Sequence, residues 1–436
     1  MSSTSESAPS RSSESAFSRV RQVEISEPIP PLSASSEALL VRLWGRPLGF
    51  TYVAMPASAD EIAAAIWRDL RPAIQRALLE GGLPLLTSLS TSGVPTGEAT
   101  WKRDRSRVEQ HGPPATVVLC TRNRPEMLAR ALRSLAGVVY HNIEIIVVDN
   151  APGDDRTRLV VEQHAETMPH PLRYLREQRP GLSWARNAGV SYGGGEIIAF
   201  MDDDVVVDPI WLAEIVRAFD LAENVGCVTG QVLPFDPDSD VSRWRETYAG
   251  ATKFGFERKV FDRYTGGTST LYPFTTGECG SGMNMAFRRA SLARIGGFAT
   301  ALGAGTPCRG GEDLAAFFGV MNAGERLVYE PGALASHAHR SRYDDLELQM
   351  TGWGSGLTAY LTHLVASDPK QAGRLVLRSA AGLRTAVSPT SRKNRRKPPD
   401  YPVTLTHAEL RAMPTGPWRY VRGRHQSHRI ARGLAP

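Results

Sequence analysis

One stretch constrains this chain more than any other: residues 196–205, Glu-Ile-Ile-Ala-Phe-Met-Asp-Asp-Asp-Val, where an apolar run ends in three carboxylates. The run is short, rich in β-branched and aromatic residues, and follows three glycines, which indicates a buried parallel strand leading into a loop. Adjacent acids resist desolvation, so they are tolerated where a cation neutralises them or where water reaches them. The stretch therefore predicts either an acidic solvated turn or a site for a hard divalent cation that shares phosphate oxygens.

Composition limits the classes to which the chain can belong. Its 436 residues, 42% of them hydrophobic, suffice for one large domain with appendages, and a net charge of +6 is too mild to indicate a nucleic-acid binder. The four cysteines show no CxxC pairing, so neither a zinc site nor a disulfide framework is indicated. We expect a cytoplasmic protein without a signal peptide or transmembrane helix, whose membrane contact, if any, is peripheral.

Changes in composition divide the chain into five parts. Residues 1–35 are rich in Ser, Glu and Pro and predict a disordered leader, whereas 36–110 show two short strand patterns and an amphipathic helix, typical of a small N-terminal α/β domain. The main α/β domain is expected over 111–342, helices over 343–390, and a basic tail over 391–436. Residues 234–275 are long for a loop and predict either a mobile lid or plain disorder.

The main domain shows the alternation of a doubly wound sheet. Strands are expected at residues 115–120, 143–148, 172–175, 196–201 and 226–232, with helical patterns between them. Ligands bind beyond the carboxyl ends of such strands, where Thr121, Asp149 and the acids Asp202 to Asp204 would emerge together. No G-x-G-x-x-G or other Gly-rich loop follows the first strand, which argues against dinucleotide binding and disfavours a nucleotidyltransferase.

Five motifs in order resemble inverting family 2 glycosyltransferases with the GT-A fold. They are Val117-Val-Leu-Cys-Thr-Arg-Asn-Arg-Pro125, Ile145-Ile-Val-Val-Asp-Asn150, Gly181-Leu-Ser-Trp-Ala-Arg-Asn-Ala-Gly189, Ala199-Phe-Met-Asp-Asp-Asp204 and Gly311-Glu-Asp313. The resemblance covers about residues 114–340 and implies a Rossmann-like mixed sheet of the nucleotide-diphospho-sugar transferase type. It also implies a nucleotide-sugar donor whose diphosphate is bridged by a divalent cation, Mn²⁺ or Mg²⁺, to the Asp-x-Asp motif.

The resemblance assigns the donor side of the site residue by residue. Thr121 would contact the nucleotide, Asp149 would hold the base or ribose, and Arg186 would line the nucleotide site. Asp203 would face the donor's ribose or sugar, while Asp204 would take the metal, with Asp202 as an alternative or helper.

The acceptor side is assigned in the same way. Asp313 matches the family's catalytic base, which takes the proton of the acceptor hydroxyl, and Glu312 is a second acid beside it. Gly282 and Asn284 belong to a Gly-rich turn that resembles the segment shaping the acceptor pocket. One of two histidines, His337 or His339, could complete the metal site.

The sequence thus predicts metal-dependent transfer of a sugar from a nucleotide diphosphate to a hydroxyl acceptor, which could be a glycan, a lipid-linked molecule or a small molecule, with inversion. The alternative is an inactive nucleotide- or carbohydrate-binding protein of the same fold. From Lys370 onward, 15 Lys or Arg stand against 2 acids. Such a run is usually a solvated face; contact with an anionic membrane is the second interpretation, and nucleic-acid binding, which lacks stacking aromatics, comes third.

Overall fold

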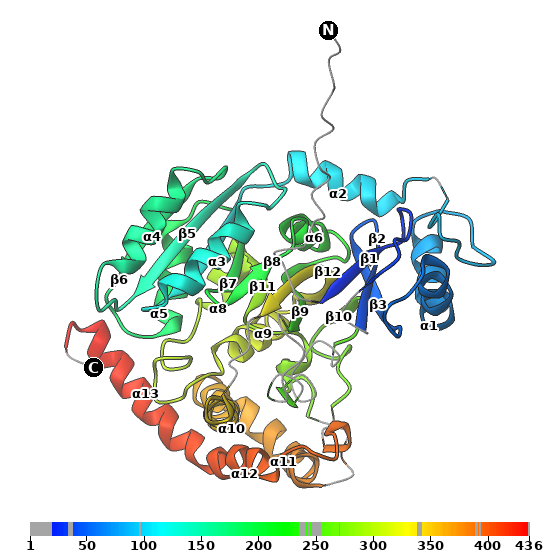
Figure 1. The fold of residues 1–436 in the computed structure, drawn as a ribbon. Coiled ribbons are helices and arrows are strands. Elements are labelled where there is room, and N and C mark those ends of the chain that lie inside the picture. The colour runs from blue at the N-terminus through cyan, green and yellow to red at the C-terminus, as the bar shows by residue number, and fades with distance from the viewer. Residues whose placement is uncertain are drawn as a thin grey trace.

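The structure is a computed structural model, and it describes residues 20–434 apart from 34–37, 96, 235–240, 242–243, 246–253, 270, 338–341, 389–390 and 392–393. Its centre is a large mixed sheet, flanked by an N-terminal unit on one side and by C-terminal helices below (Figure 1). Within the described residues this sheet has nine strands in the order β10-β12-β9-β11-β7-β4-β5-β6, with β8 paired to β12.

The strands expected from the sequence are present, and the sheet extends beyond them. β4, β5, β6 and β7 pair in parallel, as do β9 and β12, whereas β11 runs antiparallel between β7 and β9. The strands are β4 Ala115–Thr121, β5 Ile143–Asn150, β6 Leu172–Glu177, β7 Ile197–Asp202, β8 Val205–Val207, β9 Val225–Pro234, β10 Lys259–Phe261, β11 Asn284–Arg288 and β12 Arg326–His337. The predicted α/β class with a GT-A-like mixed sheet is confirmed.

Helices cover both faces of the sheet and bury two apolar layers. One layer packs beneath α3 Pro125–Leu135, α4 Arg156–Ala165 and α6 Trp211–Ala218. The other packs beneath α5 Leu182–Tyr192, α8 Arg289–Ile295 and α9 Glu312–Asn322. In α3, Pro125 opens the helix and Leu128, Ala131, Leu132 and Leu135 are buried, as their helical spacing predicts. The chain thus forms three layers, with its strand ends open at one edge.

The N-terminal unit contains a small sheet with the order β1-β2-β3. Its elements are β1 Arg21–Glu24, β2 Ala38–Leu43, β3 Arg46–Tyr52, α1 Ala59–Glu80 and α2 Thr100–His111. The predicted boundary of the leader is wrong for residues 20–33, because β1 pairs with β2 and its apolar side chains are buried. These are Val23, Ile25, Ile29 and Leu32. The part of the predicted leader before residue 20 lies outside the described part of the chain.

The C-terminal region is helical throughout much of its described length. α10 Tyr343–Ser367 and α11 Lys370–Val387 are followed by α12 Val403–Ala412 and α13 Gly416–Ala431, which lie along the lower edge of the molecule (Figure 1). The prediction of a basic tail over 391–436 is corrected here, because Leu405 and Tyr420 are buried against α10 and its neighbours. Among the described residues, no helix combines the length and apolarity needed to cross a membrane.

Candidate active site

The carboxyl ends of β4, β5 and β7 meet at one edge of the main sheet. Thr121 is paired in register with Asp149, and Cys120 with Asp202. A cavity of about 300 Å³ opens there. It is lined by strand-end residues, one residue of α5 and part of the loop before α9: Cys120, Thr121, Arg122, Arg124, Asn150, Leu182, Asp202, Asp203, Asp204, Ala304 and Gly305. The structure therefore brings Thr121 and all three acids to one cavity.

Two of the acids are held by neighbouring side chains. The Thr121 hydroxyl donates to Asp203 Oδ2 at 2.7 Å, and Arg124 Nη1 lies 3.0 Å from Asp203 Oδ1 and 3.2 Å from Asp204 Oδ2. On the other side, His337 Nε2 lies 3.3 Å from Asp204 Oδ1. Asp204 thus sits between a cation from the loop after β4 and an imidazole at the end of β12.

The three carboxyl groups differ in protonation. Burial, reinforced by the neighbouring Asp204 and Asp203, raises the pKa of Asp202 to about 7 although Arg186 opposes the rise. Burial and the charge of Asp204 also raise the pKa of Asp203. Burial acts on Asp204 in the same sense, but His337, Arg124 and Arg245 outweigh it and hold the pKa of Asp204 well below its usual range. Asp204 is therefore the acid whose surroundings favour the ionised form most strongly.

The donor set at Asp204 fits a hard divalent cation that keeps water or phosphate ligands. Such an ion takes only one or two carboxylates from the protein, and imidazole is also a common ligand. In the ranges that the structure describes, no three His, Cys, Asp or Glu side chains converge to enclose an ion. Asp204 and His337 are the pair that would hold it, with Asp202 nearby, while His339 lies outside the described residues.

Arg186 joins the acid cluster to the start of α9. Its side chain is 2% exposed; Nη1 lies 3.0 Å from Glu312 Oε1, Nη2 lies 3.4 Å from Asp202 Oδ1, and Nη2 donates to the Gly282 carbonyl at 3.0 Å. The predicted donor contact of Arg186 and the predicted acceptor contact of Glu312 are not part of this arrangement, because both side chains are buried against each other. Arg186 instead acts as a bridge between the two sides of the site.

Asp313 lies in the first turn of α9 and is half-buried. Its Oδ2 accepts a hydrogen bond from the Gly282 backbone at 3.1 Å. A Cβ added at Gly282 would lie 2.8 Å from the same oxygen, so only glycine allows this approach. Gly282 thereby links Asp313 to Arg186 through its two backbone groups.

The structure places Asn284, which the resemblance assigned to the acceptor pocket, inside the sheet and not among the residues that line the cavity. The side chain is fully buried; its Oδ1 accepts from Trp211 Nε1 at 2.8 Å, and its Nδ2 donates to the carbonyls of Gln231 and Ala333. These three hydrogen bonds join β11 to β9, β12 and α6. A polar residue in a Gly-rich motif predicted a ligand contact, but both faces of β11 are buried, and the side chain lies within the sheet core.

Asp149 is fully buried at the end of β5, where Tyr174 donates to its Oδ2 at 2.9 Å and burial raises its pKa. The adjacent Asn150 lines the cavity, and its Oδ1 accepts a hydrogen bond from the Gly181 backbone amide at 2.9 Å, which fixes the start of α5.

The sequence analysis did not predict a role for Arg124, although a cation directly before a helix-opening proline in the first motif was a usable signal. Ala304 and Gly305 gave no such signal.

The mixed sheet and the acids at its strand ends define a GT-A-type α/β protein. The family model of glycosyl transferase family 2 matches residues 116–296 of the chain. The motif resemblance is thereby confirmed, and residues 116–296 form a family 2 glycosyltransferase domain. That match ends before Asp313 and His337.

Individual relatives are distant or match in part. The chain is 23% identical over 271 residues to a glucosyl-dolichyl phosphate glucuronosyltransferase of Haloferax volcanii, covering 59% of this chain and 80% of the relative. It is 30% identical to the succinoglycan biosynthesis protein ExoM of Rhizobium meliloti, covering 49% and 63%. An uncharacterized glycosyltransferase of Nostoc is 32% identical over 26% of this chain, but the match spans only 34% of that protein. A mannosyltransferase of Pyrobaculum calidifontis, solved with GDP-Man and Mn²⁺, superposes with a TM-score of 0.43 at 21% identity over 74% of this chain and 77% of that one.

Proposed function

We propose that this chain transfers a sugar from a nucleotide diphosphate donor to a hydroxyl acceptor with inversion at the anomeric carbon. The observation that carries the proposal is the Arg186 bridge, which joins Asp202 at the cavity to Glu312 and, through Gly282, to Asp313. A buried cation between two acidic groups holds them at a fixed separation, as a displacement between two bound substrates requires. A protein that only bound a nucleotide would have no use for the second acid.

The roles of the residues follow from their surroundings. Thr121 and Arg124 hold Asp203 at the cavity, where its carboxylate can accept hydrogen bonds from donor hydroxyls. Asp204 and His337 would hold a divalent cation, which when bound would supply positive charge for the leaving diphosphate. Asp313, half-buried and fixed by the Gly282 amide, takes the proton of the acceptor hydroxyl as that oxygen attacks the anomeric carbon. Because the attack and departure occur in one in-line step, the configuration inverts.

The test uses the full chain and a panel of nucleoside diphosphates with and without Mn²⁺ or Mg²⁺. Binding to the folded state raises the melting temperature by mass action, so one base should give a metal-dependent shift. Asp204→Asn should abolish that shift. Asp313→Asn should keep it but lose transfer from the matching nucleotide sugar.

Three results would contradict the proposal. If no nucleotide shifts the melting temperature of the folded wild type, the cavity is not a donor site. If Asp313→Asn transfers at the wild-type rate, Asp313 is not the base. If NMR shows that the product retains the donor's anomeric configuration, the single-displacement step is wrong. Metal-dependent binding without any turnover would favour the inactive binding protein of the same fold.

A lipid-linked acceptor and peripheral membrane contact also belong to this proposal. The Haloferax volcanii relative acts, by its name, on a dolichyl phosphate-linked sugar. In this chain, α13 carries Arg419, Arg422, Arg424, Arg429 and two histidines without an acidic residue. Trp418 and Val421 are exposed at 60% and 63% on the same helix, and Arg422 lies over the Trp418 ring at 4.6 Å. Exposed aromatics among arginines suit an anionic lipid surface, where each basic residue contributes about 1 kcal/mol.

Point variants test this surface better than truncation, because α13 also buries Tyr420 in the core. The full chain should sediment with vesicles of phosphatidylcholine and phosphatidylglycerol but not with phosphatidylcholine alone. Trp418→Ser with Val421→Glu should abolish sedimentation, whereas Leu159→Glu, at a similarly exposed position on α4, should leave it unchanged. Equal pelleting of wild type and both variants would dismiss membrane contact through α13.

A further inference from the structure

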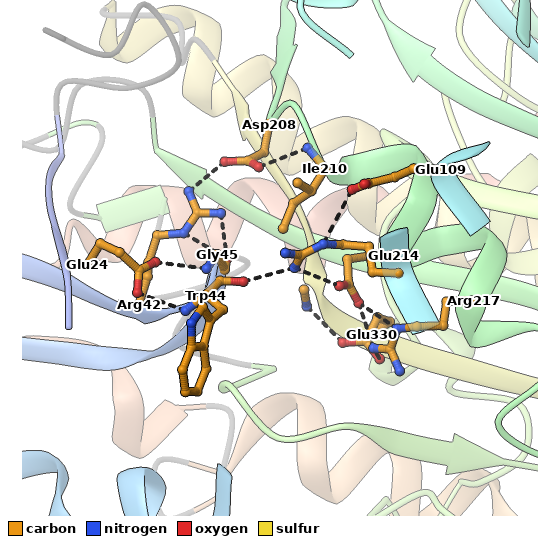
Figure 2. Close-up of polar contacts among 12 residues, drawn as sticks. Glu24, Arg42, Trp44, Gly45, Glu109, Asp208, Ile210, Glu214, Arg217 and Glu330 are labelled. Carbon is orange, nitrogen blue, oxygen red and sulfur yellow. Dashed lines mark hydrogen bonds and ion pairs between the residues drawn. The ribbon is translucent and has the colours of Figure 1, made fainter. Parts of the chain in front are cut away.

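A buried ion pair fastens the N-terminal unit to the strand that follows the acid cluster. Arg42 of β2 donates Nη1 to Asp208 Oδ2 at 2.6 Å, and both side chains are buried (Figure 2). The guanidinium is itself fixed, because its Nε donates to the Gly45 carbonyl at 2.7 Å within the β2–β3 turn. Arg42 therefore presents a rigid, charged anchor to Asp208.

Asp204 immediately precedes the three-residue strand β8, and Asp208 immediately follows it. β8 pairs antiparallel with the end of β12, so that Val205 lies opposite His337 and Val207 opposite Ala335. The Asp208 amide continues this ladder by donating to the Leu334 carbonyl at 3.0 Å. Fixing Asp208 thus fixes where β8 ends, and through its three residues the position of Asp204, which lies 3.3 Å from His337.

Apolar packing alone would not set this register. Leu40 of β2 packs against Val206 and Leu334, but all three residues of β8 are valines, so a slip by one residue would exchange one valine for another. A one-residue slip turns every side chain of a strand to the opposite face, and here it would turn Asp204 away from His337. A buried ion pair tolerates no such slip, because an unpaired buried charge is strongly disfavoured.

We propose that Arg42 and Asp208 are positioning residues that set the register of β8 against β12 and thereby the geometry of the Asp204–His337 pair. The reading of that pair as a cation site rests on the proposed function, whereas the register itself does not. On this account the N-terminal unit contributes to donor binding without touching the donor.

The same interface supplies a matched control. Arg105 of α2 lies 3.3 Å from Glu214 of α6 and donates to the Trp44 carbonyl at 2.9 Å, and both charged side chains are as buried as Arg42 and Asp208. Neither α2 nor α6 carries an acid of the cavity. Breaking this pair should lower stability in the same way but leave β8 in place.

The experiment compares Arg42→Met, Asp208→Asn and Arg105→Met in the full chain, at a urea concentration where all are folded. Mn²⁺ is the probe, titrated alone and followed by its EPR signal. Loss of groups that orient metal ligands typically weakens metal affinity about 10–100-fold. We expect that loss for Arg42→Met and Asp208→Asn, while Arg105→Met keeps the wild-type affinity despite a similar fall in the urea midpoint.

Amide hydrogen exchange provides a readout that needs no metal. Arg42→Met and Asp208→Asn should accelerate exchange in residues 205–208 and 334–337, and Arg105→Met should not. Equal Mn²⁺ affinity in all variants together with unchanged exchange at these amides would overturn the proposal and leave Arg42 a purely stabilising residue. If wild type binds no Mn²⁺, the proposed cation site fails, and the exchange result alone decides the register.

Discussion

Removing the Arg186 guanidinium should destabilise the fold far more than loss of an ordinary charge. Arg186→Met retains an apolar side chain beside Phe298 and Phe200, whose rings the guanidinium faces, but leaves Glu312, 6% exposed, without its cation. Breaking one partner of a buried pair costs about 3–5 kcal/mol, because the remaining charge stays buried and uncompensated. An exposed pair of the same geometry would cost about 0–1 kcal/mol. Because Arg186 and Glu312 are both buried, we expect the larger of these two costs.

A double-mutant cycle separates the pair from general damage. In Arg186→Met with Glu312→Gln the stranded charge is gone, so part of the lost stability should return. The coupling energy should then be about 0.5–3 kcal/mol, the range for residues in direct contact. Urea unfolding followed by tryptophan fluorescence measures all four proteins. A single variant that costs under about 1 kcal/mol, or costs that simply add, would refute the buried bridge.

Two further predictions concern Gly282 and Glu330. Gly282→Ala places a Cβ 2.8 Å from Asp313 Oδ2, so it should displace Asp313, lowering transfer while the metal-dependent nucleotide shift persists; unchanged transfer would show that Asp313 can move without loss. Glu330 is fully buried, yet Arg258 and Arg217 outweigh burial and hold its pKa below the usual 4.5. A lowered folded-state pKa gives stability that is fully present above the unfolded pKa, the usual 4.5, and is lost as the pH falls through the folded pKa. Glu330→Gln should therefore be less stable than wild type near neutral pH, with a gap that shrinks as the pH falls below 4.5 in urea titrations; a gap independent of pH would contradict this.

The parallel strands were predictable because burial on both faces makes them continuous apolar runs. β1 was missed because Val23, Ile25 and Ile29 are interspersed with polar residues, so that the average composition of the leader concealed a buried pattern. In the C-terminal region, the high content of basic residues likewise concealed a buried apolar pattern. There, the apolar positions Leu405 and Tyr420 anchor helices whose other faces carry the charge.

The convergence of Thr121 with Asp202 to Asp204 followed from the rule that parallel strands end at one edge. Which side chains reach the cavity did not, since this depends on rotamer and strand direction. Arg124 turns back to the acids, whereas Asn284 turns into the sheet and Arg186 into the protein interior. These orientations are tertiary facts that no spacing in the sequence encodes.

Helix α10 approaches the start of α9 closely. Gly311 has a φ of 93°, and a Cβ there would lie 2.8 Å from the Gly356 carbonyl oxygen. The start of α9, which carries Asp313, therefore packs against α10, which follows the family match in the sequence. Asp204 is positioned through β8 by Arg42, which precedes that match. Under the proposed function, opposite ends of the chain would therefore support the sites of the two substrates. We expect that in such an arrangement exchange of the C-terminal helices alters the choice of acceptor while the choice of nucleotide is inherited unchanged.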